Sequence, residues 1–242
     1  MGLLTGKIAL VTGASKGIGR AIAIKFAQEG AQVAFTYLSS VEKGLALEAE
    51  LKAFGITAKG YRSDASDFKA ADELINAVVT DFGGLDILVN NAGAAWGQDF
   101  EAFPEKGWDK VMDLNVKSLF FLTQALFPTL KAAATAARPG KVINIASIDG
   151  LRLNPWETYS YQASKAAVIN LTKRLSARLI TDHINVTAIA PGAFASEMNK
   201  AARDYGDAIA PGIPSGRIGA DEDMAAAAIY LAARSGDYVV GE

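Results

Sequence analysis

The sequence of 242 residues contains no cysteine and only one histidine, His183. Without cysteine the chain has no disulfide, no thiol nucleophile and no thiolate ligand for a metal. A single histidine among scattered carboxylates lacks the ligand spacing of a metal centre, so we expect no metal site. The 24 basic and 26 acidic residues nearly cancel, and no stretch concentrates Lys and Arg with aromatics. This pattern gives no support to a role on nucleic acid or at a membrane surface.

Long hydrophobic runs are also missing. The longest apolar runs are far too short to cross a membrane. Residues 1–6 are too few for a secretory signal, because Lys7 already opens a strand-like run. We therefore expect a cytoplasmic protein. Half of the residues are apolar and no interdomain linker is visible, which favours one domain over residues 1–242.

Short apolar runs alternate with segments of helical periodicity along the whole chain. The runs predict strands at residues 7–12, 32–37, 56–62, 85–89, 141–146, 183–189 and 238–240. Asp67 is the expected N-cap of a helix over residues 68–82. This alternation is typical of β-α-β units, so we predict an α/β fold: a doubly wound, Rossmann-like parallel sheet of about seven strands. Ligands of such sheets bind at the carboxyl ends of the strands.

A glycine-rich turn follows the first predicted strand and precedes a helix-like segment. Its glycines, Gly13, Gly17 and Gly19, have the spacing Gly-x-x-x-Gly-x-Gly. Glycines permit a tight turn with close ligand approach, and the N-terminus of a helix attracts a pyrophosphate. The turn therefore predicts a dinucleotide site, although a glycine-rich loop without a ligand has the same pattern.

The second predicted strand ends without an acidic residue. Residues 36–40 are T-Y-L-S-S, and in dinucleotide folds this strand end faces the adenosine ribose. An acid there would repel a 2′-phosphate, whereas Lys16 in the glycine turn would attract one. The pattern favours NADP(H) and leaves NAD(H) possible. The alternative for Lys16 is an ordinary solvated lysine.

Tyr161 and Lys165 are four residues apart in a segment with helical periodicity, which places both on one helix face. A nearby ammonium lowers the pKa of a phenol, so the pair is a candidate proton donor. Ser147 ends the fifth predicted strand and is the candidate hydrogen-bond donor to a substrate oxygen. Tyr159 is the weaker candidate because position 163 is alanine.

Other residues keep two interpretations. His183 is more typical of a structural residue at a strand start. Asp149 fits a substrate contact and a turn cap equally well. Four apolar side chains fit either a substrate pocket or packing within a loop: Trp96, Trp156, Phe194 and Met198.

The glycine turn, the Asn90-Asn91-Ala92-Gly93 segment, Ser147 and the Tyr161/Lys165 pair occur in this order. In this order they resemble the short-chain dehydrogenase/reductases over essentially the whole chain. Residues 95–97, 107–112 and 183–186 are most similar to 3-oxoacyl-(acyl-carrier-protein) reductases and to β-ketoacyl reductases of rhamnolipid-type pathways.

The resemblance implies a sheet of strand order 3-2-1-4-5-6-7 with helices on both faces. It also implies a role for each matching residue. The catalytic set would be Ser147, Tyr161, Lys165 and Asn115. Besides Tyr161 and Lys165, the cofactor-binding set would be Gly13, Ser15, Lys16, Gly17, Ile18, Gly19, Tyr37, Ser39, Asp64, Ala65, Asn91, Ala92, Gly93, Pro191, Gly192, Phe194 and Ser196. Asn115 would hold a water that links Lys165 to solvent.

Some positions depart from the family pattern. Leu38 stands where many NADP-preferring members carry arginine, and Tyr37 stands where NAD-preferring members carry an acid. The seventh strand is expected to be incomplete, because the sequence stops at Glu242. Residues 193–215 are expected to form a lid over the substrate.

These features predict an oxidoreductase that reduces a carbonyl of a small molecule, of the 3-oxoacyl type or similar, with NADPH and with Tyr161 as the proton donor. One alternative is a dehydrogenase that oxidises a sugar, polyol or steroid alcohol with NAD(P). Another is a nucleotide-binding regulatory protein without turnover. Apolar excess in residues 117–137 and 159–180 predicts a homodimer or homotetramer through these segments.

Overall fold

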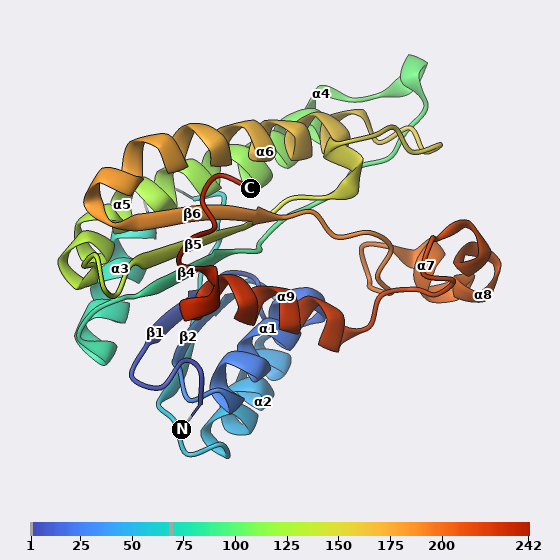
Figure 1. Cartoon of the computed structure of the whole chain (residues 1–242). Coiled ribbons are helices and arrows are strands. Elements are labelled where there is room, and N and C mark those ends of the chain that lie inside the picture. Colours follow the sequence, from blue (N-terminus) through green and yellow to red (C-terminus); the bar gives the residue numbers. More distant parts are fainter. Residues whose placement is uncertain (1, 68–69) are drawn as a thin grey trace.

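The computed structural model describes residues 2–67 and 70–242 and shows one parallel sheet between two layers of helices (Figure 1). The strands are β1 (Ile8–Val11), β2 (Gln32–Tyr37), β3 (Ala58–Arg62), β4 (Ile87–Asn90), β5 (Gly140–Ile145) and β6 (Ile184–Ile189). Within the described residues the order is β3-β2-β1-β4-β5-β6, and each neighbouring pair is parallel. The predicted α/β fold is confirmed, whereas the predicted strand count of seven is wrong.

The predicted seventh strand does not form, because the chain pairs with β6 over too few residues. Residues 238–240 form no strand, and only two backbone hydrogen bonds join the following residues to β6. Gly241 donates to the carbonyl of Val186, and the N–H of Ala188 donates to the carbonyl of Glu242. Two bonds align the chain beside β6 without making a ladder.

Helices cover both faces of the sheet. The lower layer in Figure 1 holds α1 (Gly17–Gln28), α2 (Val41–Lys52) and α9 (Asp221–Ala232). The upper layer holds α3 (Ala70–Phe82), α4 (Glu105–Met112), α5 (Ser118–Ala133) and α6 (Tyr159–Leu179). The predicted start of the third helix at residue 68 lies outside the described residues. The two short helices α7 (Lys200–Asp204) and α8 (Gly206–Ile209) project from the body.

The short helical turns join these elements. They are η1 (Phe100–Ala102), η2 (Asp113–Lys117), η3 (Ile148–Gly150), η4 (Ile180–Asp182), η5 (Ala210–Gly212) and η6 (Arg234–Gly236). Of these, η2 is a π-helical turn that joins α4 to α5, and the others are 3-10 turns.

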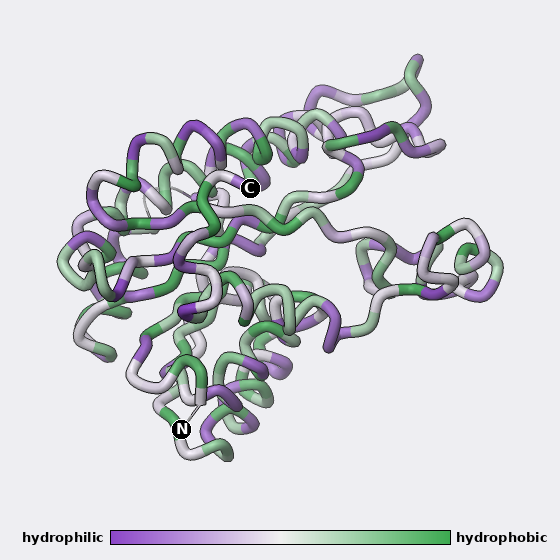
Figure 2. Tube along the Cα trace, in the orientation of Figure 1, coloured by the Kyte–Doolittle hydropathy of each residue, from purple (hydrophilic) through white to green (hydrophobic). Residues whose placement is uncertain are grey.

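The strands are apolar on both faces because helices cover both, and Figure 2 shows hydrophobic residues along much of the sheet. One core cluster packs α1 and α9 against the sheet, with Phe26, Phe35 and Ile22 fully buried. The second packs α3, α5 and α6 against the other face, around Leu88, Leu126 and Leu130. Two cores of this kind hold the sheet rigid and fix its carboxyl edge.

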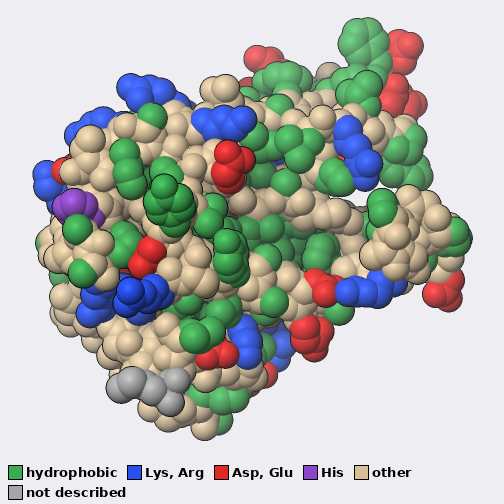
Figure 3. Space-filling view, viewed as in Figure 1, with side chains coloured by type: hydrophobic (Ala, Val, Ile, Leu, Met, Phe, Trp, Pro, Cys, Tyr) green, Lys and Arg blue, Asp and Glu red, His purple; other side chains and the backbone are tan. Residues whose placement is uncertain are grey.

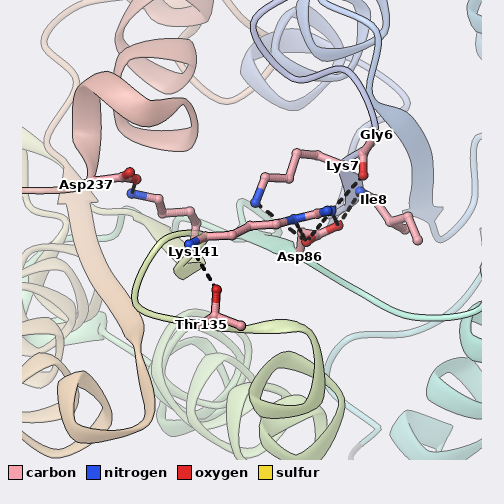
Figure 4. Close-up of polar contacts among 8 residues, drawn as sticks. Gly6, Lys7, Ile8, Asp86, Thr135, Lys141 and Asp237 are labelled. Atoms are coloured by element: carbon pink, nitrogen blue, oxygen red, sulfur yellow. Dashed lines mark hydrogen bonds and ion pairs between the residues drawn. The ribbon is translucent and has the colours of Figure 1, made fainter.

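Charged side chains cluster at the opposite, amino edge of the sheet (Figure 4). Asp86, 4% exposed, accepts hydrogen bonds from the guanidinium of Arg138 and from the backbone N–H of Ile8. Lys141, 3% exposed, pairs with Asp237 at 2.8 Å. Burial lowers the pKa of Lys141 and the carboxylate opposes that shift. The Lys141–Asp237 pair fastens the segment after α9 to β5, and both pairs lie far from the strand ends expected to bind ligands.

Candidate active site

The candidate catalytic residues meet at the carboxyl edge of the sheet. Ser147 lies just after β5, and α6 carries Tyr161 and Lys165 one turn apart, as predicted. The Ser147 side chain lies close enough to the phenol of Tyr161 to influence its pKa. The Nζ of Lys165 lies 5.6 Å from the centre of the Tyr161 ring. The three side chains, predicted from two separate segments of the sequence, are therefore brought together.

Ser147 is held with its proton available. The backbone N–H of Asp149 donates to the Ser147 Oγ at 3.1 Å, at the start of the 3-10 turn η3. An oxygen that accepts this bond keeps its own O–H free to donate. Asp149 thus contributes its backbone to a turn. Its carboxylate also acts on Tyr161 by raising the pKa of the phenol.

The pKa of Tyr161 lies above its ordinary value. Burial of the phenol is the largest cause, and the nearby Ser147 hydroxyl opposes it. Lys165 is buried, 6% exposed, and its Nζ donates to the carbonyl of Ile145 at 2.7 Å. This differs from the expectation that Lys165 lowers the pKa of the phenol, because the ammonium is turned toward the end of β5.

Burial also changes Lys165 itself. Desolvation lowers its pKa to about 8, so the side chain is poised to exchange a proton near neutral pH. Such a shift is common in catalytic groups and requires a low-dielectric site. Lys165 therefore combines the geometry and the proton affinity expected of a residue that supports Tyr161.

Asn115 occupies the π-helical turn η2 between α4 and α5 and is 3% exposed. Its Oδ1 accepts from the N–H of Ala94, and its Nδ2 donates to the carbonyl of Ala94 and to the Oγ of Ser164. The side chain thus ties the loop after β4 to α6. π turns often mark functional sites. Sequence reasoning missed Ser164, whose only signal was a polar residue on the buried face of α6.

The glycine turn is anchored to both neighbouring strands. The N–H of Gly13 donates to the Oγ1 of Thr36 at 3.0 Å, and Nδ2 of Asn91 donates to the carbonyls of Thr12 and Gly13. A Cβ on Gly19 would lie 2.4 Å from that Nδ2. The two threonines were missed from sequence, although polar residues at the ends of buried strands were available as a signal.

The turn fits a dinucleotide. Gly17 has a φ of +57°, and a Cβ built on it would have no heavy atom within 4 Å. Lys16, the N-cap of α1, makes no side-chain capping bond. An open space above the turn and uncapped N–H groups at the start of α1 are what a pyrophosphate requires. The chain's own residues thus leave room for the cofactor that the sequence predicts.

The residues predicted to meet adenosine divide into two groups. A narrow hollow is lined by Asp64 and Ala65 beyond β3, together with Thr12, Thr36 and Phe121. Asp64 Oδ1 also accepts from the N–H and hydroxyl of Ser66. The ring of Tyr37 is instead buried under α2, against Gly44 and Gly60. Only the backbone of Tyr37 is therefore placed to meet the adenosine at the end of β2.

The segment after β6 brings the remaining predicted residues to the same edge. The carbonyl of Pro191 accepts from Ile148 N–H, and Gly192 has open space beside it. Phe194 packs on Gly219, and the carbonyl of Ala193 accepts from Gly219. Residues 194–218 thus leave and rejoin the body at one point. Figure 3 shows a notch between this projecting segment and the main body.

The competing candidates lie apart from the triad. The hydroxyl of Tyr159 donates to Glu157, and its ring stacks edge-on with Phe100. His183 precedes β6 in a left-handed conformation at the amino edge of the sheet. Trp96 packs over Gly107, whereas Trp156 is 62% exposed. In the part of the chain that the structure describes, no cluster of ligand side chains could hold a metal, and no helix is long and apolar enough to span a membrane.

Comparison with known proteins decides the family. The family model of short chain dehydrogenases matches residues 7–206. This chain is a short-chain dehydrogenase. The family consists of NAD(P)-dependent oxidoreductases that act on carbonyl and alcohol groups, and the predicted membership is confirmed.

Two curated relatives cover nearly the whole chain. The rhamnolipids biosynthesis 3-oxoacyl-(acyl-carrier-protein) reductase of Pseudomonas aeruginosa is 42% identical, over 98% of this chain and 93% of the relative. The 3-oxoacyl-(acyl-carrier-protein) reductase FabG of Staphylococcus epidermidis is 38% identical, over 98% and 95%. These similarities confirm the branch of the family that the sequence indicates.

Solved structures agree with the fold. The Pseudomonas aeruginosa RhlG/NADP active-site complex superposes with a TM-score of 0.93 at 41% identity, over 98% of this chain and 93% of that chain. A short-chain dehydrogenase from Burkholderia cenocepacia in complex with NADP gives 0.92 at 33% identity, over 98% and 95%. Both comparison structures were determined with NADP.

Proposed function

We propose that this short-chain dehydrogenase is an NADPH-dependent reductase of 3-oxoacyl-type ketones. The observation that carries the proposal is the placement of Ser147 and Tyr161 beside the buried Lys165, at the same edge of the sheet as the glycine turn. The names of two relatives and the NADP in two similar structures support the substrate class and the cofactor.

The bound dinucleotide would supply the hydride and, once oxidised, a positive charge near the phenol. The residues of this chain position the ketone and supply its proton. The hydroxyl of Ser147 donates to the carbonyl oxygen, where negative charge develops as the hydride arrives. Tyr161 O–H donates to the same oxygen and transfers its proton, so the product is a secondary alcohol.

We propose that a proton returns from Lys165 to Tyr161 through an intervening hydroxyl or water, because the Lys165 Nζ is bonded to the carbonyl of Ile145 rather than to the phenol. A pKa of about 8 lets Lys165 give up a proton near neutral pH and regain one from solvent. Asn115 has both polar atoms of its side chain in hydrogen bonds to Ala94 and Ser164. We propose that its backbone carbonyl in the π turn, rather than the side chain, holds the water that links Lys165 to solvent.

We also propose that the enzyme self-associates through α5 and α6. Phe121 on α5 remains 39% exposed, and Ile180 just after α6 is exposed to the same extent. Large exposed apolar side chains on neighbouring helices favour burial against a second copy. Sedimentation at micromolar concentration should give a dimer or tetramer, and a monomer alone would contradict this proposal.

The reaction is tested by following NADPH absorbance with a methyl 3-oxoacyl ester and with the corresponding thioester. The proposal predicts NADPH consumption with formation of the 3-hydroxy product. Oxidation of sugars, polyols or steroid alcohols with NAD⁺ while 3-oxo compounds are left unchanged would replace it with the oxidative alternative. Cofactor binding without turnover of any carbonyl or alcohol would instead favour a regulatory protein.

A further inference from the structure

The start of α2 lies against the end of β2, where the adenosine ribose of a dinucleotide is expected. A Cβ on Gly44 would lie 2.7 Å from the ring of Tyr37, the last residue of β2, so glycine allows the helix to approach this closely. The contact fixes the first turn of α2 beside the strand end. Lys43, the residue before Gly44, is held there with an exposed side chain.

Lys43 faces the same hollow as the glycine turn. This hollow of about 340 Å³ runs between α1 and α2 and opens beside Ser15, Lys16 and Gly17. The bonds from Gly13 and Ala14 to Thr36 hold the turn against β2. The hollow therefore adjoins the phosphate turn, and that turn is bonded to the ribose-facing strand end.

The charges in this hollow are not equivalent. Arg20 is neutralised by its ion pair with Glu50. Among the residues that the structure describes, Lys16 and Lys43 form no ion pair within the same hollow, whose carboxylates are Glu50, paired with Arg20, and Asp221. After the Arg20 pair is set aside, two cations face one acid, so an anion entering from the turn meets a net positive charge.

We propose that Lys43, acting with Lys16, binds the 2′-phosphate of NADP(H) and thereby determines cofactor choice in this chain. The inference rests on the proposed function. Leu38 offers no charge at the position where an arginine is common in the family. A lysine from the first turn of α2 supplies that charge from the other side of the strand end. Lys43 is thus a specificity-determining residue that contacts the cofactor far from the reacting atoms.

The test measures binding of NADPH and NADH by nucleotide fluorescence, without a substrate. Loss of one charge-assisted contact with a phosphate should weaken NADPH binding about 10-fold or more in Lys43→Met, and leave NADH binding within about 2-fold. Lys43→Arg should keep the affinity for NADPH. Lys52→Met is the matched control, because Lys52 is an exposed lysine at the other end of the same helix.

Two results would overturn the inference. One is a Lys43→Met variant that binds NADPH as the Lys52→Met control does. The other is loss of NADPH preference in Arg62→Met with Lys43→Met unaffected, because the Nε of Arg62 donates to the carbonyl of Leu38 at 3.3 Å from the side of β3. Failure of the wild-type enzyme to bind NADPH would instead refute the proposed function, so the two failures are distinguishable.

Discussion

Replacing Lys165 with methionine should stabilise the protein in a pH-dependent way. The lysine is buried, and desolvation lowers its pKa from 10.5 to about 8. Because the folded-state pKa lies below the unfolded one, protonation of Lys165 disfavours the fold. This cost is fully present below about pH 8 and is lost as the pH rises through 10.5. Methionine has a similar length and carries no charge, so it removes the cost.

The magnitude follows from the two pKa values. The cost of the lysine is about 3 kcal/mol at pH 7 and about 1 kcal/mol at pH 10. Lys165→Met also loses the hydrogen bond to the carbonyl of Ile145, which lowers the stability of the variant. This loss is about the same at pH 7 and at pH 10. The stability difference between Lys165→Met and wild type should therefore be about 2 kcal/mol more favourable at pH 7 than at pH 10.

Urea unfolding at the two pH values measures this difference. Lys173→Met is the control, because Lys173 is exposed on the same helix and its removal should give the same change at pH 7 and pH 10. If the Lys165→Met difference did not vary with pH, the ammonium would not be desolvated and the proton-relay role derived from its lowered pKa would be wrong.

Three further outcomes are expected. Asn115→Ala removes three buried hydrogen bonds, so urea unfolding should show a loss of about 2–3 kcal/mol and kcat should fall. Asp237→Asn leaves the ammonium of Lys141 buried without its charged partner, which should lower the free energy of unfolding by about 3 kcal/mol in the same assay. Adding Lys141→Met should restore most of this stability. A double variant as unstable as Asp237→Asn would contradict the pairing. Gly19→Ala forces a Cβ into the glycine turn, so NADPH titration should show about 10-fold weaker binding or worse. Gly17→Ala should also weaken binding, because its φ of +57° strains an alanine and the new Cβ enters the space left for the pyrophosphate.

The sequence predicts much of the fold because the strands are continuous apolar runs. All six observed strands fall within or close to predicted ranges, and the alternation with helices leads to a parallel sheet. The seventh strand was wrong because strand propensity in residues 238–240 does not create a partner ladder. Only the two bonds from β6 to the last two residues form.

The site was predictable to the level of residue types but not of their contacts. Spacing brings Tyr161 and Lys165 onto one helix face, whatever the rest of the fold does. It does not show that Lys165 points to the carbonyl of Ile145, because that direction depends on how α6 packs on β5. The place of Lys43 was missed for a similar reason, since the approach of α2 to β2 depends on the contact between Gly44 and Tyr37.

The proton donor is the central claim, and a single-turnover measurement on Tyr161→Phe tests it most directly. Enzyme saturated with NADPH is mixed with the 3-oxoacyl ester, and hydride transfer is followed by loss of NADPH absorbance. The account predicts a rate lower by about 10²- to 10⁴-fold with unchanged NADPH affinity, because the phenol proton is removed and the ring remains. A rate near that of the wild type would contradict it.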